Sequence, residues 1–221
     1  MSEKDSKIIV NKLEKYLANK SKRLHDPIFF GNEIRYLNKC IETGFVSYVG
    51  KFVETFEKKL CNFTKSKFVV ATSSGTAALH LILDYLNIGK NDEVLVPGYT
   101  YVATANAIKY CKATPNFVDI DTETLGVCPK KLENYLRKII IKKKNKSFNK
   151  HTKKHIKAII IVHVYGFSCK VNAIKKICKK YNIELIEDAA EAVGSFYKKK
   201  HLGTFGNFGI LSFNGNKTIT S

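Results

Sequence analysis

The sequence predicts an α/β protein with a mostly parallel β-sheet. Short, almost continuously apolar segments alternate along the chain with longer amphipathic segments. Continuous apolar strands are typical of strands buried on both faces, and their alternation with helices is typical of parallel sheets. At 221 residues the chain is long enough to bury a substantial core in one large domain.

The N-terminal part is predicted to be an appended arm over residues 1–30, with the main domain over 31–221. One amphipathic helix is expected over 7–20, and the polar segment SKRLHDP links it to the domain. Two further helices, NEIRYLNKCIETG and KFVETFEKKLCNF, then precede the alternating pattern.

The remaining chain is predicted to alternate between strands and helices. The expected strands are 67–72, 92–97, 114–120, 157–164, 183–188 and 209–213. The expected helices are 75–87, 101–111, 130–141 and 170–182. Ligands of such sheets bind at the carboxyl ends of the strands, so we look for chemistry in the loops that follow them.

Most of the formal net charge of +19 comes from one part of the chain. Residues 134–183 contain fifteen Lys or Arg and no Asp or Glu. Within them KKKNKSFNKHTKKH has no apolar period and one aromatic residue, Phe148, so we interpret about 142–156 as a solvated, Lys-rich insertion. Recognition of single-stranded nucleic acid usually needs several aromatic side chains, so a basic nucleic-acid-binding module is the less favoured alternative.

Other features bound the class of protein. The six cysteines are scattered singly, without a C-x-x-C pair or a nearby histidine, so we expect reduced thiols and no metal site. No apolar run is long enough to cross a bilayer, and the start MSEKDSK lacks the apolar centre of a secretory signal. We therefore expect a cytoplasmic protein without a membrane partner.

A phosphate site is predicted after the first expected strand. Ser74, Gly75 and Thr76 open the helix that follows residues 67–72. Amides at a helix N-terminus, together with nearby hydroxyl groups, bind phosphate. The same residue types also cap helices throughout proteins, so a cap without a ligand is an equal alternative.

Later strand ends carry side chains suited to a planar ligand. Tyr101 follows one strand, where an aromatic ring can lie against a flat molecule. Asp188 ends another, where a carboxylate needs a cationic partner. Ser212 and Lys217 follow the last, in a segment that lacks the Gly-Lys pair of a nucleoside-triphosphate loop. A phosphate anchor, an aromatic ring, a carboxylate and a lysine are the groups that pyridoxal 5'-phosphate requires.

Several ordered motifs resemble one family over residues 67–220. SSGTAALHL, PGYTYVATANAI, DID, VHVYG, EDAAEAVGS and SFNGNKTIT are similar to motifs of the pyridoxal-phosphate sugar aminotransferases of the DegT/DnrJ/EryC1/StrS family. The resemblance implies the large domain of a fold-type I, aspartate aminotransferase-like enzyme, with its small C-terminal domain missing from the chain. The segment 25–57 resembles the branch that aminates nucleotide-linked 4-keto sugars for legionaminic acid.

The resemblance also implies roles for individual residues. Lys217 corresponds to the Schiff-base lysine, and Asp188 to the partner of the pyridine nitrogen. Tyr101 corresponds to the aromatic residue that stacks on the cofactor. Glu191 stands where many relatives have a glutamine on the phenolic oxygen, a role that requires a protonated or rotated carboxylate. The implied phosphate contacts are Gly75, Thr76 and Ser212, with Ser74 beside them.

The implied activity is amino transfer to a nucleotide-linked keto-deoxysugar for surface glycan biosynthesis, with glutamate as the expected donor. Family members with histidine in place of this lysine dehydrate the sugar, so Lys217 favours transfer of nitrogen. Members of the family are dimers, which predicts a homodimer for the full-length form. The alternative is a truncated remnant that binds its cofactor weakly and has little or no activity.

Overall fold

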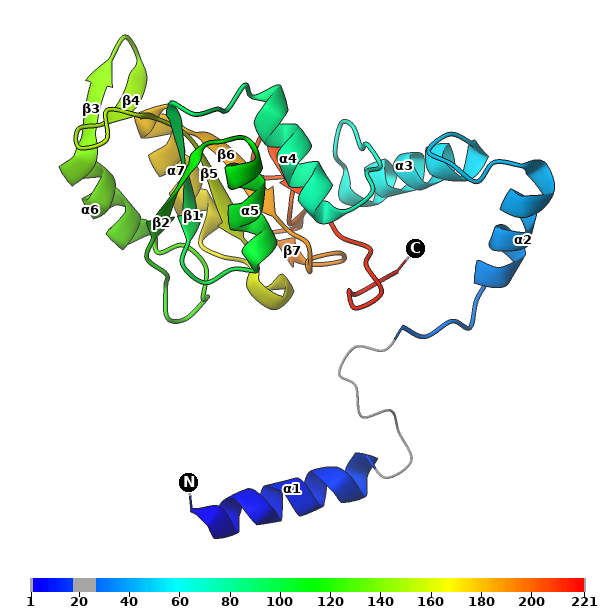
Figure 1. Ribbon diagram of the computed structural model, residues 1–221. Coiled ribbons are helices and arrows are strands. Elements are labelled where there is room, and N and C mark those ends of the chain that lie inside the picture. Colours follow the sequence, from blue (N-terminus) through cyan, green and yellow to red (C-terminus); the bar gives the residue numbers. More distant parts are fainter. Residues whose placement is uncertain (1, 18–26, 221) are drawn as a thin grey trace.

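The computed structural model describes residues 2–17 and 27–220 and confirms an α/β fold with a mostly parallel sheet (Figure 1). A seven-stranded sheet forms the centre, and a separate hairpin of two short strands, β7 (Phe196–Tyr197) and β8 (Lys200–His201), lies outside it. The helices are α1 (Glu3–Leu17), α2 (Glu33–Thr43), α3 (Lys51–Thr64), α4 (Gly75–Tyr85), α5 (Val102–Tyr110), α6 (Pro129–Ile139), η1 (Val164–Gly166) and α7 (Val171–Tyr181).

Five strands of the sheet are parallel and lie in the order β2-β1-β5-β6-β9. Their carboxyl ends therefore meet at one edge of the sheet. Asp188 at the end of β6 pairs with Val162 of β5 on one side and with Ile210 of β9 on the other. The strands are β1 (Asp92–Pro97), β2 (Thr114–Val118), β5 (His155–Val162), β6 (Glu184–Asp188) and β9 (Phe208–Ile210).

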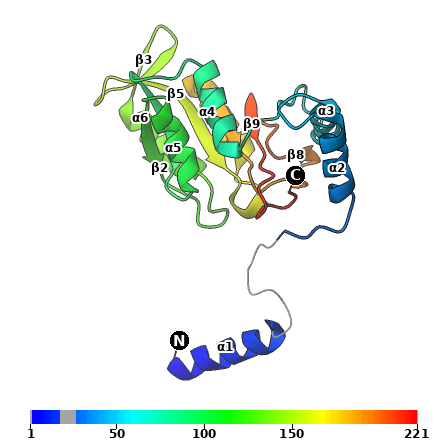
Figure 2. The same cartoon turned by 45° about the vertical axis from the view of Figure 1, so that its right-hand side comes forward.

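Helices cover both faces of the sheet, as Figures 1 and 2 show. Successive residues of a strand point to opposite faces, so each strand contributes to two cores. Val96 of β1 packs in the core that contains Leu83 of α4, whereas its neighbour Leu95 packs in the core that contains Leu136 of α6 and Ile174 of α7. This burial on both faces explains the almost continuous apolar strands of the sequence.

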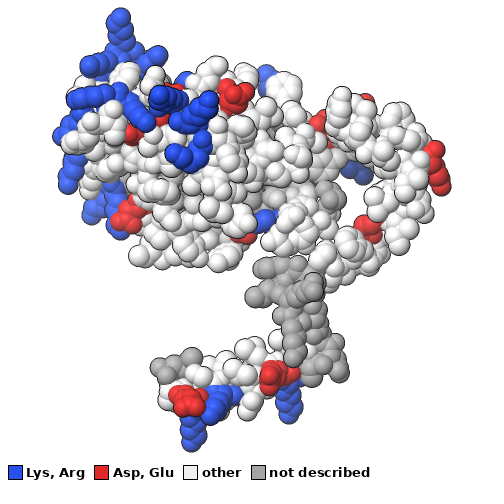
Figure 3. Space-filling model, in the orientation of Figure 1, with Lys and Arg blue, Asp and Glu red and all other residues white. Residues whose placement is uncertain are grey.

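The predicted Lys-rich insertion contains most of a β-hairpin, which the sequence did not indicate. Strands β3 (Ile140–Lys143) and β4 (Lys146–Asn149) pair antiparallel, and Phe148 of β4 pairs with His155 at the start of β5. Lys and Arg side chains gather over this part of the molecule (Figure 3). The hairpin thus extends the sheet at the end opposite the carboxyl edge.

Buried polar residues explain why the hairpin had no apolar period. Ser147 and Asn149 point inward and are 0% and 5% exposed. The hydroxyl of Ser147 donates to the carbonyl of Tyr181, and the amide of Asn149 donates to Glu93 at 3.0 Å. Thr152 also donates to Glu93, which is itself buried. Because the buried residues of β4 are polar, the strand gives no hydrophobic signal.

The prediction of a strand over 67–72 is wrong. These residues pair with no strand in the described part of the chain, and their apolar side chains are exposed, at 76% for Phe68 and 69% for Val70. The backbone N–H of Ala71 donates instead to the carboxylate of Glu57 in α3 at 2.8 Å. The segment has the composition of a strand, but no strand of residues 2–17 or 27–220 lies beside it to pair with it.

The N-terminal helices leave much of their apolar surface exposed. α1 begins four residues earlier than predicted and has no buried residue, and the predicted positions 18–20 lie outside the described residues. Most of the predicted link SKRLHDP lies outside the described residues. Leu37 and Ile41 of α2 are 63% and 71% exposed, and Val46 and Tyr48 in the following loop are 73% and 87% exposed. We call the apolar side chains of residues 34–49 the arm surface.

Candidate active site

The predicted site residues lie on elements that meet at the carboxyl edge of the sheet. Asp188 ends β6, and Glu191 follows it in the next turn. Ser212 and Lys217 follow β9, which pairs with β6. The remaining predicted residues are Ser74 as the N-cap of α4, Gly75 and Thr76 in its first turn, and Tyr101 as the N-cap of α5.

The N-terminus of α4 lies close to Ser212, and the two together are a candidate anion site. The Ser74 hydroxyl oxygen accepts the N–H of Ala77 at 3.1 Å, so its own proton remains available to a ligand. A Cβ atom built on Gly75 would lie 3.8 Å from the Oγ atom of Ser212. The N–H groups of Gly75 and Thr76 meet no acceptor among residues 2–17 and 27–220. N–H groups at a helix start with a hydroxyl beside them are suited to bind a phosphate.

Asp188 is a buried carboxylate held by neighbouring hydroxyl and amide groups. Its Oδ2 atom accepts from the hydroxyl of Thr104 at 2.8 Å, and its Oδ1 atom accepts from the N–H of Ala190 at 3.3 Å. Burial raises the pKa of Asp188 above its ordinary value, although the hydrogen bonds and the positive charge of Lys217 act in the opposite direction. A carboxylate in this environment readily shares a proton with a basic ligand.

Lys217 forms an ion pair with Glu191. The Nζ atom of Lys217 lies 3.0 Å from Oε1 of Glu191, and the Lys217 side chain is only 18% exposed. The other oxygen of Glu191 accepts the backbone N–H of Tyr165 at 3.1 Å. The carboxylate therefore holds the amine near the end of β5 and close enough to Asp188 to influence its charge.

The aromatic residues at this edge are exposed. Tyr101 is 77% exposed, so its ring is open to a ligand, and stacking by this residue stays a prediction. The hydroxyl groups of Tyr99 and Tyr165 lie 3.4 Å apart. This contact raises the pKa of Tyr99 above its ordinary value. Tyr165 has a φ of 52°, in the left-handed region that non-glycine residues seldom adopt.

Sequence reasoning missed Thr104 and Tyr165. Thr104 is fully buried within α5, and its hydroxyl also lies 2.8 Å from that of Thr100. A hydroxyl on the buried face of a helix is a signal for a polar partner. The identity of the partner depends on the tertiary fold, because Asp188 lies 84 positions later.

The described ranges contain neither a candidate membrane-spanning helix nor a candidate metal-binding cluster. No helix there is long and apolar enough to span a bilayer. No group of three or more His, Cys, Asp or Glu side chains there is placed to hold a metal ion.

Comparison with known proteins places this edge in context. A family model described as the DegT/DnrJ/EryC1/StrS aminotransferase family matches residues 29–221. The GDP-perosamine synthase of Vibrio cholerae is 42% identical over 198 residues, which are 90% of this chain and 50% of that protein. The GDP-perosamine synthase of Escherichia coli O157:H7 is 41% identical, with the same coverage of 90% and 50%. The chain thus spans about half the length of the curated relatives it matches.

Solved structures agree with the fold. An aminotransferase from Psychrobacter cryohalolentis matches with a TM-score of 0.76 and 30% identity, over 88% of this chain and 45% of that one. Spr1654 from Streptococcus pneumoniae in its PLP form has a TM-score of 0.76 and 29% identity, over 90% and 50%. The relatives from Vibrio cholerae and Escherichia coli are GDP-perosamine synthases, which does not support the predicted legionaminic acid branch. The family predicted from the motifs is confirmed: the chain belongs to the DegT/DnrJ/EryC1/StrS aminotransferase family.

Proposed function

We propose that this chain is the cofactor-binding part of a pyridoxal-phosphate sugar aminotransferase. The observation that carries the proposal is a buried carboxylate at the end of β6 close to a largely buried lysine in the segment that follows the neighbouring strand β9. The hydroxyl of Thr104 donates a hydrogen bond to the Asp188 carboxylate. The positive charge of Lys217 acts to lower the pKa of Asp188, but burial has the larger effect, so this pKa is raised. Membership of the family supports the reaction class.

The residues at this edge fit pyridoxal phosphate. The N-terminus of α4 and the Ser212 hydroxyl would hold the phosphate, since the amides of Gly75 and Thr76 meet no acceptor among the described residues. Asp188 would face the ring nitrogen. Lys217 would bind the aldehyde, and Tyr101 would cover the ring. A PLP form and a PMP form of Spr1654 support this choice of cofactor.

The chain's own groups would manage the protons of the reaction. When bound, pyridoxal phosphate supplies an aldehyde that carries the amino group and a ring that withdraws electrons. The Asp188 carboxylate would keep a proton on the ring nitrogen. The Nζ atom of Lys217 would take a proton from the donor's α-carbon and later return one to the sugar carbon. Glu191 would hold Lys217 in reach of both positions through the contact of 3.0 Å.

The acceptor that we propose is the keto carbon of a GDP-linked deoxysugar. The two perosamine synthases, both over 40% identical to this chain, support a GDP carrier. Glutamate is the proposed amino donor. The remainder of the active site, including contacts to the nucleotide, would come from outside the chain, because the relatives are about twice as long.

We also propose that the full-length protein is a homodimer. The arm surface supports this proposal, because exposed apolar patches of this kind mark interaction sites. A second copy of the chain would cover Leu37, Ile41 and the loop that follows α2.

The half-reaction with glutamate tests the function without the sugar. The chain is loaded with pyridoxal phosphate and mixed with glutamate, and 2-oxoglutarate is quantified. We expect formation of 2-oxoglutarate, up to one equivalent per loaded site, and none from the Lys217→Ala variant. Equal amounts from the two proteins would contradict the assignment of Lys217. Aspartate and alanine, used in parallel, test the choice of donor.

A further inference from the structure

We propose that Glu187 is a positioning residue that fixes β9, the strand that precedes Ser212 and Lys217. The role of those two residues rests on the function proposed above. Glu187 precedes Asp188 in β6, and neighbouring strand residues point to opposite faces. Its side chain therefore lies behind the site, where it is 0% exposed.

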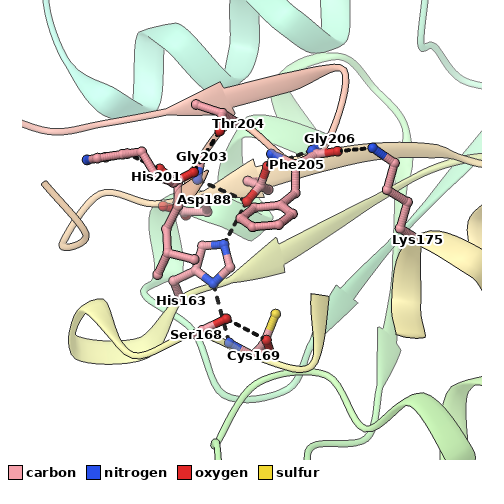
Figure 4. A network of polar contacts seen from close by, with 12 residues as sticks. His163, Ser168, Cys169, Lys175, Asp188, His201, Gly203, Thr204, Phe205 and Gly206 are labelled. Carbon is pink, nitrogen blue, oxygen red and sulfur yellow. Dashed lines mark hydrogen bonds and ion pairs between the residues drawn. The ribbon is translucent and has the colours of Figure 1, made fainter. Parts of the chain in front are cut away.

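Four hydrogen bonds converge on the Glu187 carboxylate. One oxygen accepts the backbone N–H groups of Phe205 at 2.5 Å and Gly206 at 2.6 Å. The other accepts the N–H of Gly203 at 2.9 Å and lies 2.8 Å from Nε2 of His163. Figure 4 labels the four residues that carry these donor groups. A carboxylate has about four acceptor positions, so all of them are used.

His163 is suited to donate to this carboxylate. Its Nδ1 atom accepts the backbone N–H of Cys169 at 3.4 Å, which places the ring proton of a neutral histidine on Nε2. Burial raises the pKa of Glu187, but the hydrogen bonds from His163 and from the amides of Gly206 and Gly203 outweigh burial and leave it below its ordinary value. The carboxylate is therefore ionised at neutral pH.

The turn over residues 203–206, whose amides bind the Glu187 carboxylate, lies directly against β6. A Cβ atom on Gly206 would come within 2.4 Å of the carbonyl oxygen of Leu185. A Cβ atom on Gly209 would come within 2.0 Å of the carbonyl oxygen of Gly203. Only glycine allows such close contact, so the backbone of residues 203–209 is fitted to β6 and to the Glu187 carboxylate.

The turn determines where the proposed cofactor lysine lies. β9 has three residues and pairs only with β6 among the described strands, with Glu187 opposite Gly209 and Asp188 opposite Ile210. Such a short edge strand has few ladder hydrogen bonds of its own. The Glu187 carboxylate fixes the turn before β9 and thereby the register of the segment that brings Ser212 to the N-terminus of α4 and Lys217 near Asp188.

Amide hydrogen exchange of the Glu187→Gln variant tests the anchoring. Glutamine has one acceptor oxygen and a donor group that would face backbone N–H groups, so we expect exchange at residues 203–206 to accelerate by about tenfold or more. Glu93→Gln is the matched control, because Glu93 is also buried and accepts three neutral hydrogen bonds, but at the other end of the sheet. Unchanged exchange at 203–206 in Glu187→Gln would overturn the proposal.

Cofactor capture tests the consequence for the site. Pyridoxal phosphate bound at Lys217 is fixed with borohydride and quantified by peptide mass. We expect at least tenfold less labelling in Glu187→Gln, partial recovery in Glu187→Asp, and labelling close to wild type in Glu93→Gln. A mobile turn with normal labelling would contradict a positioning role. If the wild-type chain is not labelled, the proposed function fails, and exchange at residues 208–217 decides whether Glu187 positions β9.

Discussion

Glu187 and Asp188 are adjacent carboxylates in opposite environments. Both are buried, and burial raises the pKa of each. Around Glu187 the hydrogen bonds from His163, Gly206 and Gly203 outweigh burial, whereas around Asp188 the hydrogen bonds from Thr104 and Ala190 do not. The pKa of Glu187 therefore lies below its ordinary value and the pKa of Asp188 above it. The lowered pKa suits Glu187 to be a permanently ionised structural group, and the raised pKa suits Asp188 to share a proton with a ligand.

The raised pKa of Asp188 predicts a cost in stability. Between the unfolded value of about 3.9 and the higher folded value, the native state binds more protons than the unfolded state. The free energy of unfolding contributed by this group therefore falls as pH rises through that window and stays lower above it. We expect Asp188→Asn without cofactor to be more stable than wild type at pH 7, with the difference vanishing below about pH 4. Denaturant unfolding at several pH values measures this.

Thr104 is predicted to stabilise the ionised form of Asp188. Replacing it with valine removes the hydroxyl donor at 2.8 Å and leaves a buried carboxylate oxygen without that partner. We expect the free energy of unfolding at pH 7 to fall by about 1–3 kcal/mol, and by less where Asp188 is protonated. Thr104→Ser keeps the hydroxyl and serves as the control. Equal losses from valine and serine would show that packing, not the hydrogen bond, is responsible.

For single residues, the sequence predicted which side chains belong to the candidate site better than it predicted the contacts that these side chains make. Asp188 and Lys217 were identified because an acid at a strand end and a lysine in a turn-rich segment are unusual locally. Glu187 was adjacent to Asp188 yet received no role, since its four donors come from residues 16 or more positions away. Contacts at such separations depend on the packing of the sheet.

Among the elements, the Lys-rich hairpin depends on a buried polar cluster. Glu93 accepts hydrogen bonds from Asn116, Asn149 and Thr152, so the hairpin and the first two strands of the sheet share one carboxylate. The hairpin is therefore an integral part of the sheet and not a detachable insertion.

The Asn149→Ala variant tests this dependence. Loss of the amide leaves the buried Glu93 carboxylate short of one hydrogen bond, so we expect the free energy of unfolding to fall by about 1–3 kcal/mol. Lys146→Ala in the same strand removes an exposed side chain and should change it by less than about 0.5 kcal/mol. Unfolding in urea with both variants is the measurement. A urea midpoint for Asn149→Ala equal to that of the wild type would contradict a stabilising role for the hydrogen bonds to Glu93.

The elements with clear apolar periods were predicted to within a few residues, for physical reasons. The five parallel strands and helices α4 to α7 bury their apolar faces in the two cores, so their patterns reflect their structure. The hairpin could not be predicted, because its inward residues are polar. The strand expected over 67–72 failed for the opposite reason, because its apolar side chains have no neighbour to cover them.

For the whole molecule, the arm surface predicts self-association. We expect sedimentation equilibrium to show a dimer that Leu37→Glu combined with Ile41→Glu weakens by at least tenfold, because two charges would enter an apolar interface. Lys39→Glu on the same helix changes the charge without removing apolar surface and is the control. A monomer at all concentrations would contradict the dimer proposal for this chain.

The family could be predicted from the sequence because its motifs are the loops at one edge of a sheet. The sugar could not, because one N-terminal segment suggested legionaminic acid whereas the relatives are named for GDP-perosamine. Residues that select a sugar are not confined to such short motifs, and the chain spans about half of each relative.

Covalent capture of pyridoxal phosphate tests the central claim most directly. Borohydride fixes the cofactor to the amine that binds it, even where binding is weak, and peptide mass spectrometry identifies the lysine. We predict one labelled residue, Lys217, with labelling lost in Lys217→Ala and kept in Lys170→Ala, whose amine is paired with Asp121 and Glu123. Labelling spread equally over several surface lysines, or retained in Lys217→Ala, would contradict the account.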